Sequence, residues 1–539
     1  CLYIDDHSRV ILEDQKSEPG SDYINANYID DSTSRSEVYI AVQGPKKKTF
    51  EAFWLMIWQQ KCHTLAMLAN LYENGKNKCY KYWPNMDDPI TTATFVINLN
   101  SEKQYAFYVI RVITLKHRHE RKERQIYQFH YTKWPDHDIP DVFELVMFHR
   151  HLQRLRTKGD GPLVVHCSAG IGRTGTLIAL DALLEAGKTA DVIDIHGYVT
   201  IMRNNRMNMV QTVNQYKALH LALLEGLNFP NSLQTKTDFT SSEDSNVYEI
   251  PANQTQRNKE FQTLQDVNAI SEKRLKYVFA KSTENRNKNR DMDILPGDNY
   301  RVVLYSKNSQ KNYINAVKLP SFRHHLRYLV TQFPLTHTIV DFWTMVTEYR
   351  SSTIVCLEDS EGEKENPWLP AKSTVKYVDE FEIRSTSVEQ CEDNINASML
   401  EIKNKQSNTN QRVKLFQVSN WAKDSSIPSS QRVLCKLHYL VEAWMMSQEE
   451  GPIVVTCLDG AKRCGLYCLI STTLERLDME SDIDLYATTR QLQIRRPQLV
   501  ASMDQYQYTL DAVKAYLHTV GNSYYEECQH EEAVYQNNP

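Results

Sequence analysis

Residues 163–175 read LVVHCSAGIGRTG, and the apolar run TLIALDALLEA begins at Thr176. Leu163 to His166 predict a short apolar strand, and the periodicity of the later run predicts a helix. A strand that leads through a glycine-bearing loop into a helix favours anion binding. Successive backbone N–H groups point inward there, and the helix N-terminus adds positive potential. The stretch therefore predicts an anion-binding loop between a strand and a helix.

The side chains of this loop fit a phosphoryl group. Gly170, Gly172 and Gly175 leave room where the backbone must approach the anion. Arg173 offers a planar, two-pronged donor for phosphate. Cys167 lies at the floor of the loop, where a thiolate is favoured, so we predict a nucleophile aimed at phosphorus. A merely structural cysteine would not need the arginine, the histidine and three glycines around it.

Composition and length narrow the class of protein. A chain of 539 residues indicates two large domains. The formal net charge of −5 argues against a general nucleic-acid binder, because such proteins are strongly basic. Eleven cysteines without paired spacings indicate free thiols in a reducing compartment. No apolar run approaches membrane-spanning length, and the chain begins without Met, so we expect a soluble fragment of a longer protein.

The chain repeats itself. DDHSRVIL recurs as GDNYRVVL, YINANYI as YINAVKL, and AFWLMIW as DFWTMVT. The loop VVHCSAGIGRTG recurs as VVTCLDGAKRCG, which places Cys457 290 residues after Cys167. Because the offset stays nearly constant over many blocks, we infer a tandem duplication.

Each repeat is long enough to form its own domain. Short β-rich runs such as TATFVINL alternate with helical patterns such as TFEAFWLMIWQQ. The predicted fold class is therefore α/β, with two tandem domains that each contain a twisted mixed sheet flanked by helices. We expect a first domain over residues 1–228, a polar linker over 229–255, a second domain over 256–520 and an acidic tail over 521–539.

The ten residues HCSAGIGRTG resemble the signature of the cysteine-based protein tyrosine phosphatases, and the resemblance covers nearly the whole chain. Two such domains in tandem look like the cytoplasmic region of a receptor-type tyrosine phosphatase. The resemblance implies hydrolysis of phosphotyrosine in proteins through a phosphocysteine intermediate, without a metal or another cofactor. It also implies a place on the cytoplasmic side of the plasma membrane, with attachment only through a segment outside this chain.

The resemblance assigns roles in the first domain. WPDHDIP, residues 134–140, resembles the acid loop of the family, with Asp136 as the general acid. Asp138 stands where the family usually has Gly. In MVQTVNQY, Gln211 orients the hydrolytic water and Gln215 supports the site. If this stretch is helical, the two glutamines share one face.

By the same resemblance, Cys167 is the nucleophile and Arg173 clamps the phosphate. The residues expected to surround the bound phosphate are His166, Ser168, Ala169, Gly170, Ile171, Gly172, Thr174 and Gln215. His166 helps to maintain the surroundings that favour the thiolate. Alternatively, it is a buried histidine that is hydrogen-bonded to the backbone and has only a structural role. Thr174 follows the arginine and carries a hydroxyl for the sulfur.

The second loop keeps the spacing of Cys457 and Arg463 but departs elsewhere. Asp459 brings a negative charge into a cradle meant for a dianion, where repulsion weakens binding. Lys462 replaces a glycine. Its side chain either offsets the negative charge of Asp459 or obstructs the approach of an anion to the backbone. Lys423 in NWAKDSSIP occupies the place of the acid.

Two further replacements concern water activation and ring stacking. Ala501 stands where the first unit has Gln211, and Asp291 in KNRD takes the aromatic position of the family's KNRY-like segment. The first unit starts after that segment, so we expect it to be trimmed at its N-terminus. Together these losses predict an inactive second domain that serves regulation, stability or docking. Redox sensing through Cys457 is a further alternative for that domain.

Other functions remain open at this point. The chain could be a binding or scaffold protein whose domains present phosphate pockets with little turnover. It could also be a lipid or dual-specificity phosphatase, although those usually lack flanks such as YINANYI. Phosphotyrosine proteins are the expected partners. In the tail, Tyr524, Tyr525 and Tyr535 lie beside acidic residues and are hypothetical kinase sites that would recruit SH2 proteins.

Overall fold

The computed structural model describes residues 6–13, 20–33, 35–135, 138–156, 161–241, 252–305, 312–358, 368–371, 374–392, 394–448 and 451–519. Two compact units divide the chain, Cys1–Phe229 and Pro230–Pro539. The expected acid Asp136 and the tail tyrosines Tyr524, Tyr525 and Tyr535 lie outside the described residues.

A nine-stranded mixed sheet forms the centre of the first unit, in the order β1-β2-β3-β11-β4-β10-β9-β8-β7. The four strands β3, β11, β4 and β10 are parallel to one another, and the remaining neighbours are antiparallel. The bounds are β1 Arg9–Ile11, β2 Tyr23–Ile29, β3 Tyr39–Val42, β4 Thr64–Met67, β7 Ile90–Thr91, β8 Phe95–Gln104, β9 Tyr108–His117, β10 Glu123–Tyr131 and β11 Leu163–His166. A small hairpin joins β5 Tyr72–Glu73 and β6 Lys76–Asn77. The predicted strand Leu163–His166 thus lies in the middle of the sheet.

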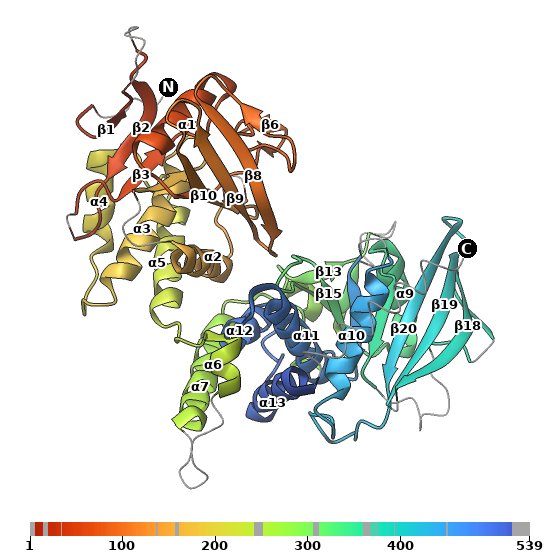
Figure 1. Ribbon diagram of the computed structural model, residues 1–539. Coiled ribbons are helices and arrows are strands. Elements are labelled where there is room, and N and C mark those ends of the chain that lie inside the picture. Colours follow the sequence, from red (N-terminus) through yellow and green to blue (C-terminus); the bar gives the residue numbers. More distant parts are fainter. Residues whose placement is uncertain are drawn as a thin grey trace. The chain divides into compact units, whose positions relative to one another are not determined.

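Helices cover this sheet (Figure 1). They are α1 Phe50–Gln59, α2 Val142–Leu155, α3 Gly172–Ala186, α4 Ile195–Asn205 and α5 Val213–Leu227, with a 3-10 turn η1 at Lys47–Thr49. The apolar spacing of FEAFWLMIWQ puts Phe53, Trp54 and Ile57 into one core with the sheet strands. Trp54 and Tyr82 are fully buried, so these aromatic residues belong to the core.

The second unit repeats the sheet in the same order, β13-β14-β15-β21-β16-β20-β19-β18-β17. The bounds are β13 Arg301–Val303, β14 Tyr313–Leu319, β15 Tyr328–Gln332, β16 Thr353–Cys356, β17 Val375–Val378, β18 Phe381–Glu392, β19 Ile395–Asn404, β20 Thr409–Val418 and β21 Ile453–Cys457. The predicted fold class, two tandem α/β domains with mixed sheets flanked by helices, is confirmed.

The helices of the second unit are α7 Ala252–Glu272, α8 Val278–Lys281, α9 Ile339–Glu348, α10 Val433–Met445, α11 Lys462–Glu480, α12 Leu485–Arg495 and α13 Met503–Thr519, with 3-10 turns η2 Arg286–Lys288 and η4 Thr336–Thr338. Part of the stretch predicted as linker has regular structure. In it, β12 Gln234–Thr235 pairs with β22 Asp482–Ile483, and α6 covers Lys236–Ser241. The beginning of that stretch therefore attaches to the second unit.

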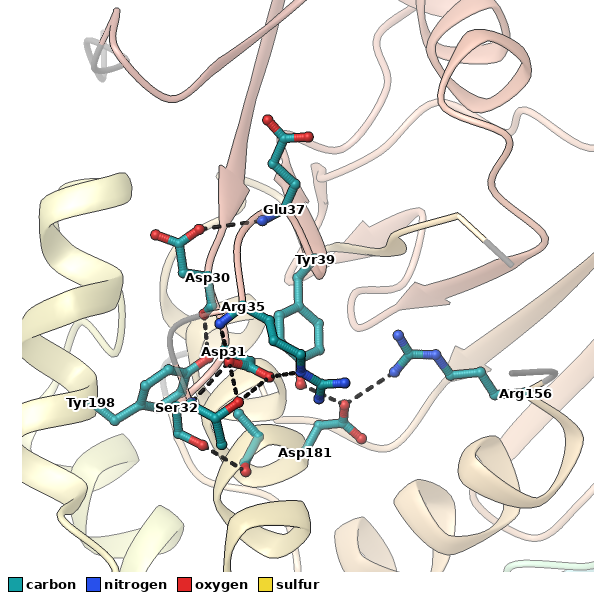
Figure 2. A network of polar contacts seen from close by, with 11 residues as sticks. Asp30, Asp31, Ser32, Arg35, Glu37, Tyr39, Arg156, Asp181 and Tyr198 are labelled. Atoms are coloured by element: carbon teal, nitrogen blue, oxygen red, sulfur yellow. Dashed lines mark hydrogen bonds and ion pairs between the residues drawn. The ribbon is translucent and has the colours of Figure 1, made fainter. Parts of the chain in front are cut away.

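A buried carboxylate holds helix α3 in place behind the anion-binding loop. Figure 2 shows Tyr39 from β3 and Arg156 reaching toward Asp181 on α3. The Tyr39 hydroxyl donates to Asp181 Oδ2 at 2.8 Å, and Arg156 Nη1 lies 3.3 Å from the same oxygen. His149 Nε2, on α2, lies 2.7 Å from Asp181 Oδ1. Burial alone would raise the pKa of Asp181, but the hydrogen bond and charge of His149 and the charge of Arg156 outweigh it and lower that pKa.

Replacing this carboxylate should destabilise the first unit in a pH-dependent way. We expect Asp181→Asn to lower the free energy of unfolding by about 3 kcal/mol at pH 7, because Arg156 and His149 lose the carboxylate with which they pair. Since the folded-state pKa is depressed, the carboxylate stabilises fully above its unfolded pKa of about 3.9 and loses this effect as the pH falls below that value. Urea unfolding of both proteins should show a difference that narrows below about pH 4. A difference that is equal at pH 7 and pH 3 would contradict this reasoning.

Candidate functional site

The anion-binding loop occupies the position that the sequence predicted. Strand β11 lies between β3 and β4 and ends at His166, Cys167 follows at 5% exposure, and α3 begins at Gly172. Gly170 has φ 72°, and a Cβ there would meet the Val42 carbonyl oxygen at 2.3 Å. The loop is therefore pressed against β3 at a position that only glycine tolerates.

Thr174 supplies a hydrogen bond to the sulfur of Cys167. Its hydroxyl donates to Sγ across 3.3 Å, and the threonine is fully buried. A donor at this distance stabilises negative charge on the sulfur. The carbonyl of Ser168 accepts from the Gly44 N–H at 3.1 Å, which ties the loop to the chain after β3. Within the described residues, the N–H groups of Ser168, Ala169, Gly170, Ile171 and Gly172 have no protein acceptor.

His166 is neutral and contacts the backbone of Cys167. It is completely buried, and burial lowers its pKa to about 4. Nδ1 lies 3.1 Å from the Cys167 carbonyl, so it must carry the proton, and Nε2 then accepts from the Tyr82 hydroxyl at 2.8 Å. Gln128 in turn donates to that hydroxyl at 2.6 Å. His166 thus acts on Cys167 through backbone position and not through a positive charge.

Arg173 is held by a glutamate that the sequence analysis did not single out. Its two terminal nitrogens lie 2.7 and 2.9 Å from the two carboxylate oxygens of Glu73, and Nη1 also donates to the Leu68 carbonyl at 3.0 Å. A bidentate pair of this kind fixes the plane of the guanidinium. In the second unit Glu358 pairs with Arg463 at 3.2 Å, but the repeat places Glu358 opposite Ala69 and not opposite Glu73, so self-comparison of the sequence would not have found this pair.

Removing this pair should impair phosphate recognition without removing the arginine. We expect Glu73→Gln to lower kcat/KM for a phosphotyrosine peptide about 100-fold, because a misplaced binding group has an effect of that order. The inhibition constant of tungstate, a phosphate-like dianion, should rise as well, whereas a purely structural role would leave it unchanged in the folded protein. The matched variant Glu358→Gln should leave turnover unaffected.

Arg206 holds the back of the loop and was also missed. It is 2% exposed, and its guanidinium donates to the carbonyls of Gly170 at 2.8 Å and Ala169 at 3.1 Å. Asn27 and Asn25 on β2 accept its remaining bonds at 2.7 and 2.6 Å. These contacts turn the loop carbonyls away from the anion side, so Arg206 is a positioning residue. It recurs 290 residues later as Arg496, which donates to Gly460 at 2.6 Å.

The acid loop lies beside Arg173. The indole of Trp134 is buried and donates to the Asp138 carbonyl at 3.1 Å, which closes a turn. The carbonyl of Pro135, the residue before Asp136, lies 3.4 Å from Arg173 Nη2. The exposed Asp138 carboxylate accepts from the Ile139 N–H at 2.8 Å. The residue before Asp136 therefore contacts Arg173, and the Asp138 backbone is fixed by Trp134.

The stretch from Gln211 to Gln215 is not helical throughout, so the two glutamines do not share one helical face. Helix α5 begins at Val213 with Thr212 as its N-cap, so Gln211 precedes the helix. Instead, the Gln215 side-chain oxygen accepts from the N–H groups of Gln211 at 2.9 Å and Thr212 at 3.2 Å. A capping interaction has replaced the helical turn, because Thr212 and Gln215 form a capping box. Gln215 thereby sets the backbone position of Gln211.

The second unit contains a pocket of about 510 Å³ at the matching place, lined among others by Cys457, Asp459, Arg463 and Lys423. Arg463 Nη1 donates to the Leu357 carbonyl at 2.9 Å, and Nη2 donates to the Ala422 carbonyl at 2.8 Å. The carbonyl of Lys423 lies 3.4 Å from Nη2. The clamp arginine of this pocket is thus surrounded by protein acceptors.

Lys462 changes the surroundings of the second loop. In the first unit a Cβ on Gly172 would lie 2.8 Å from the Gln215 amide nitrogen, so a side chain there forces the glutamine away. Gln505, the counterpart of Gln215, accordingly donates to the carbonyls of Lys462 at 2.8 Å and Ser426 at 3.1 Å. The arrangement that positions Gln211 in the first unit is therefore lost in the second.

The part of the chain that the structure describes contains no group of three or more His, Cys, Asp or Glu side chains arranged to hold a metal ion. In the same residues, no helix combines the length and apolar character that a membrane crossing requires.

Comparison with known proteins gives a consistent picture. A family model described as protein-tyrosine phosphatase matches residues 1–225 and 285–515. Receptor-type tyrosine-protein phosphatase alpha of Mus musculus is 32% identical over 534 residues, which cover 96% of this chain and 63% of that protein. Receptor-type tyrosine-protein phosphatase U of Gallus gallus is 33% identical over 528 residues, covering 96% of this chain and 36% of that protein. The chain spans less than two thirds of the length of each relative.

Proposed function

The chain belongs to the protein-tyrosine phosphatase family, and from this premise we propose that its first unit hydrolyses phosphotyrosine in proteins through a phosphocysteine intermediate. One observation carries the proposal. The sulfur of Cys167 accepts a hydrogen bond from Thr174 at the floor of a loop whose N–H groups, in the described chain, have no protein acceptor. This combination suits a nucleophile beneath a bound phosphoryl group.

In the first step the Cys167 thiolate attacks phosphorus, and the bond between phosphorus and the tyrosine oxygen breaks. Asp136 donates a proton to the departing phenolate. Arg173 and the loop N–H groups stabilise the charge on the three equatorial oxygens. The bidentate contact with Glu73 supports this role, because it holds the guanidinium plane before substrate arrives.

In the second step a water molecule attacks the phosphocysteine and releases inorganic phosphate. Gln211 orients this water, and the Asp136 carboxylate accepts its proton. The Thr174 hydroxyl stabilises the departing thiolate. The hydrogen bond from the Gln211 N–H to Gln215 supports the assignment, because it fixes the backbone of the water-orienting residue.

The second unit is proposed to be catalytically inactive and to serve regulation, stability or docking. Lys423 replaces the acid, Ala501 replaces Gln211, and Asp291 replaces the stacking aromatic residue. Each replacement removes a group that the two steps need. The altered bonding of Gln505 is consistent with the loss of water activation.

The cellular setting of the chain is part of the proposal. The relatives are named receptor-type, which supports a place on the cytoplasmic side of the plasma membrane as part of a single-pass membrane protein. Phosphotyrosine proteins would be the substrates. If kinases phosphorylate the tail tyrosines, SH2 proteins would be further partners.

Turnover of three substrate classes tests the proposal. The chain should hydrolyse a phosphotyrosine peptide and leave a matched phosphoserine peptide and a phosphoinositide essentially unchanged. Faster hydrolysis of the phosphoinositide would instead indicate a lipid phosphatase. Binding of the phosphotyrosine peptide without release of phosphate would assign the chain to the phosphate-binding scaffold proteins.

A further inference from the structure

The loop of the second unit contains a carboxylate where its counterpart has a methyl group. Asp459 stands 290 residues after Ala169 in the repeat. Its Oδ1 accepts from the N–H groups of Ala461 at 2.8 Å and Lys462 at 3.0 Å. These two residues stand at the N-terminus of α11, a helix of 19 residues. The side chain therefore occupies the position at which a helix N-terminus binds an anion.

The first unit provides an internal comparison. Ile171 and Gly172 match Ala461 and Lys462, and their N–H groups have no protein acceptor among the described residues. The two loops share their length, their Cys-x5-Arg spacing and a positive φ at the central glycine, 72° at Gly170 and 67° at Gly460. The two loops differ in one respect: in the second loop the Asp459 carboxylate of the chain itself accepts from these N–H groups.

Asp459 also changes the hydrogen bonding of the cysteine. The Cys457 thiol donates to Asp459 Oδ1 at 3.3 Å. In the first unit the sulfur of Cys167 is instead the acceptor of a bond from Thr174. The sulfur of Cys457 thus faces a carboxylate, whose negative charge repels a second anion that approaches the loop.

Glu358 adds a further internal carboxylate. Its Oε1 accepts from the Leu458 N–H at 2.7 Å, and its Oε2 lies 3.2 Å from Arg463 Nη1. In the first unit both oxygens of Glu73 pair with Arg173, and the Ser168 N–H is not engaged. Three N–H groups of the second loop are therefore bonded to the protein's own carboxylates.

We propose that Asp459 closes the second pocket to phosphate by acting as its internal anion. The pocket retains the backbone of an oxyanion site, but phosphotyrosine cannot enter while the aspartate is bound there. Docking on the second unit would then use another surface or another ligand chemistry. This inference deepens the proposed inactivity of the second unit, and it concerns anion binding, which is measured separately from turnover.

The number of tungstate sites tests the inference on the whole chain. Equilibrium dialysis should find one site in the unaltered protein and two in Asp459→Ala, which installs the residue of the first unit. Carboxymethylation of Cys457, followed by mass spectrometry, should become sensitive to tungstate only in this variant. Asp424→Ala is the matched control, because Asp424 lines the same pocket without bonding to the loop. It should leave one site.

The reciprocal variant Ala169→Asp should no longer bind tungstate in the first unit. Its turnover should fall at least about 100-fold, an effect typical of losing oxyanion donors. Two sites in the unaltered chain would overturn the inference, as would a folded Asp459→Ala that still binds one. A second tungstate site in Asp424→Ala would mean that the net charge of the pocket excludes the anion, and this result would overturn the inference as well. If the unaltered chain binds no tungstate while Asp459→Ala gains a site, the proposed function fails and the inference stands.

Discussion

Cys167→Ser abolishes phosphotyrosine hydrolysis by the whole chain, with an expected fall in kcat/KM of at least about 1,000-fold. A hydroxyl at this position is a far weaker nucleophile at neutral pH than a thiolate, and the Thr174 bond does not compensate for that difference. The phosphate-binding loop stays intact, so the variant should still bind tungstate. Steady-state hydrolysis of a phosphotyrosine peptide measures the effect.

The matched variant in the second unit separates the two domains. Cys457→Ser should leave the turnover of the unaltered chain essentially unchanged, since Cys457 belongs to the unit that is proposed to be inactive. The double variant should be as inactive as Cys167→Ser. Activity that survives in Cys167→Ser and disappears in the double variant would show that the second unit turns over substrate and would refute the proposed inactivity.

Arg173→Lys should reduce kcat/KM by about 1,000-fold, in the range of arginines that stabilise phosphoryl transfer. Lysine keeps the positive charge but cannot bond both oxygens of Glu73 and a substrate phosphate in one plane. The residue is well placed for this role, because Glu73 and Leu68 already orient it. The loss should appear in kcat as well as in KM, since the planar guanidinium fits the flattened arrangement of the equatorial oxygens in the transition state better than the tetrahedral ground-state phosphate.

Arg463→Lys is the control for this second prediction. Arg463 pairs with Glu358 and with the carbonyls of Leu357 and Ala422, all within the second unit. Its replacement should leave turnover at the level of the unaltered chain. A loss below tenfold in Arg173→Lys would mean that the arginine supplies charge alone and that the bidentate geometry is unimportant.

The strand, loop and helix around Cys167 could be predicted because their signal is local. A short apolar strand, glycines at close approaches and a periodic helix stand within a few residues of one another. The repeat could be predicted because the second unit keeps the apolar pattern of the first, and both sheets have the same strand order. Such patterns determine which face of each element is buried.

The supporting side chains could not be predicted from local patterns. Glu73 lies 100 residues from Arg173, and Arg206 reaches Gly170 across 36 positions. Nothing in the periodicity of either segment indicates these partners, although Arg206 recurs in the second unit as Arg496. The position of Gln211 outside the helix has a local cause, because Thr212 and Gln215, three residues apart, form a capping box that starts the helix at Val213.

The second unit keeps the fold of the first and differs from it at the pocket. Its sheet and the helix after the loop are retained, while the altered residues gather at the pocket. Asp459 and Glu358 satisfy N–H groups that a bound phosphate would otherwise satisfy.

Trapping the covalent intermediate tests the central claim most directly. In Gln211→Ala the second step should slow more than the first, so that phosphocysteine accumulates during turnover of a phosphotyrosine peptide. Acid quenching and peptide mass spectrometry should then find phosphate on the Cys167 peptide and none on the Cys457 peptide. Phosphate on Cys457, or phosphate release without any covalent phosphate on Cys167, would contradict the account.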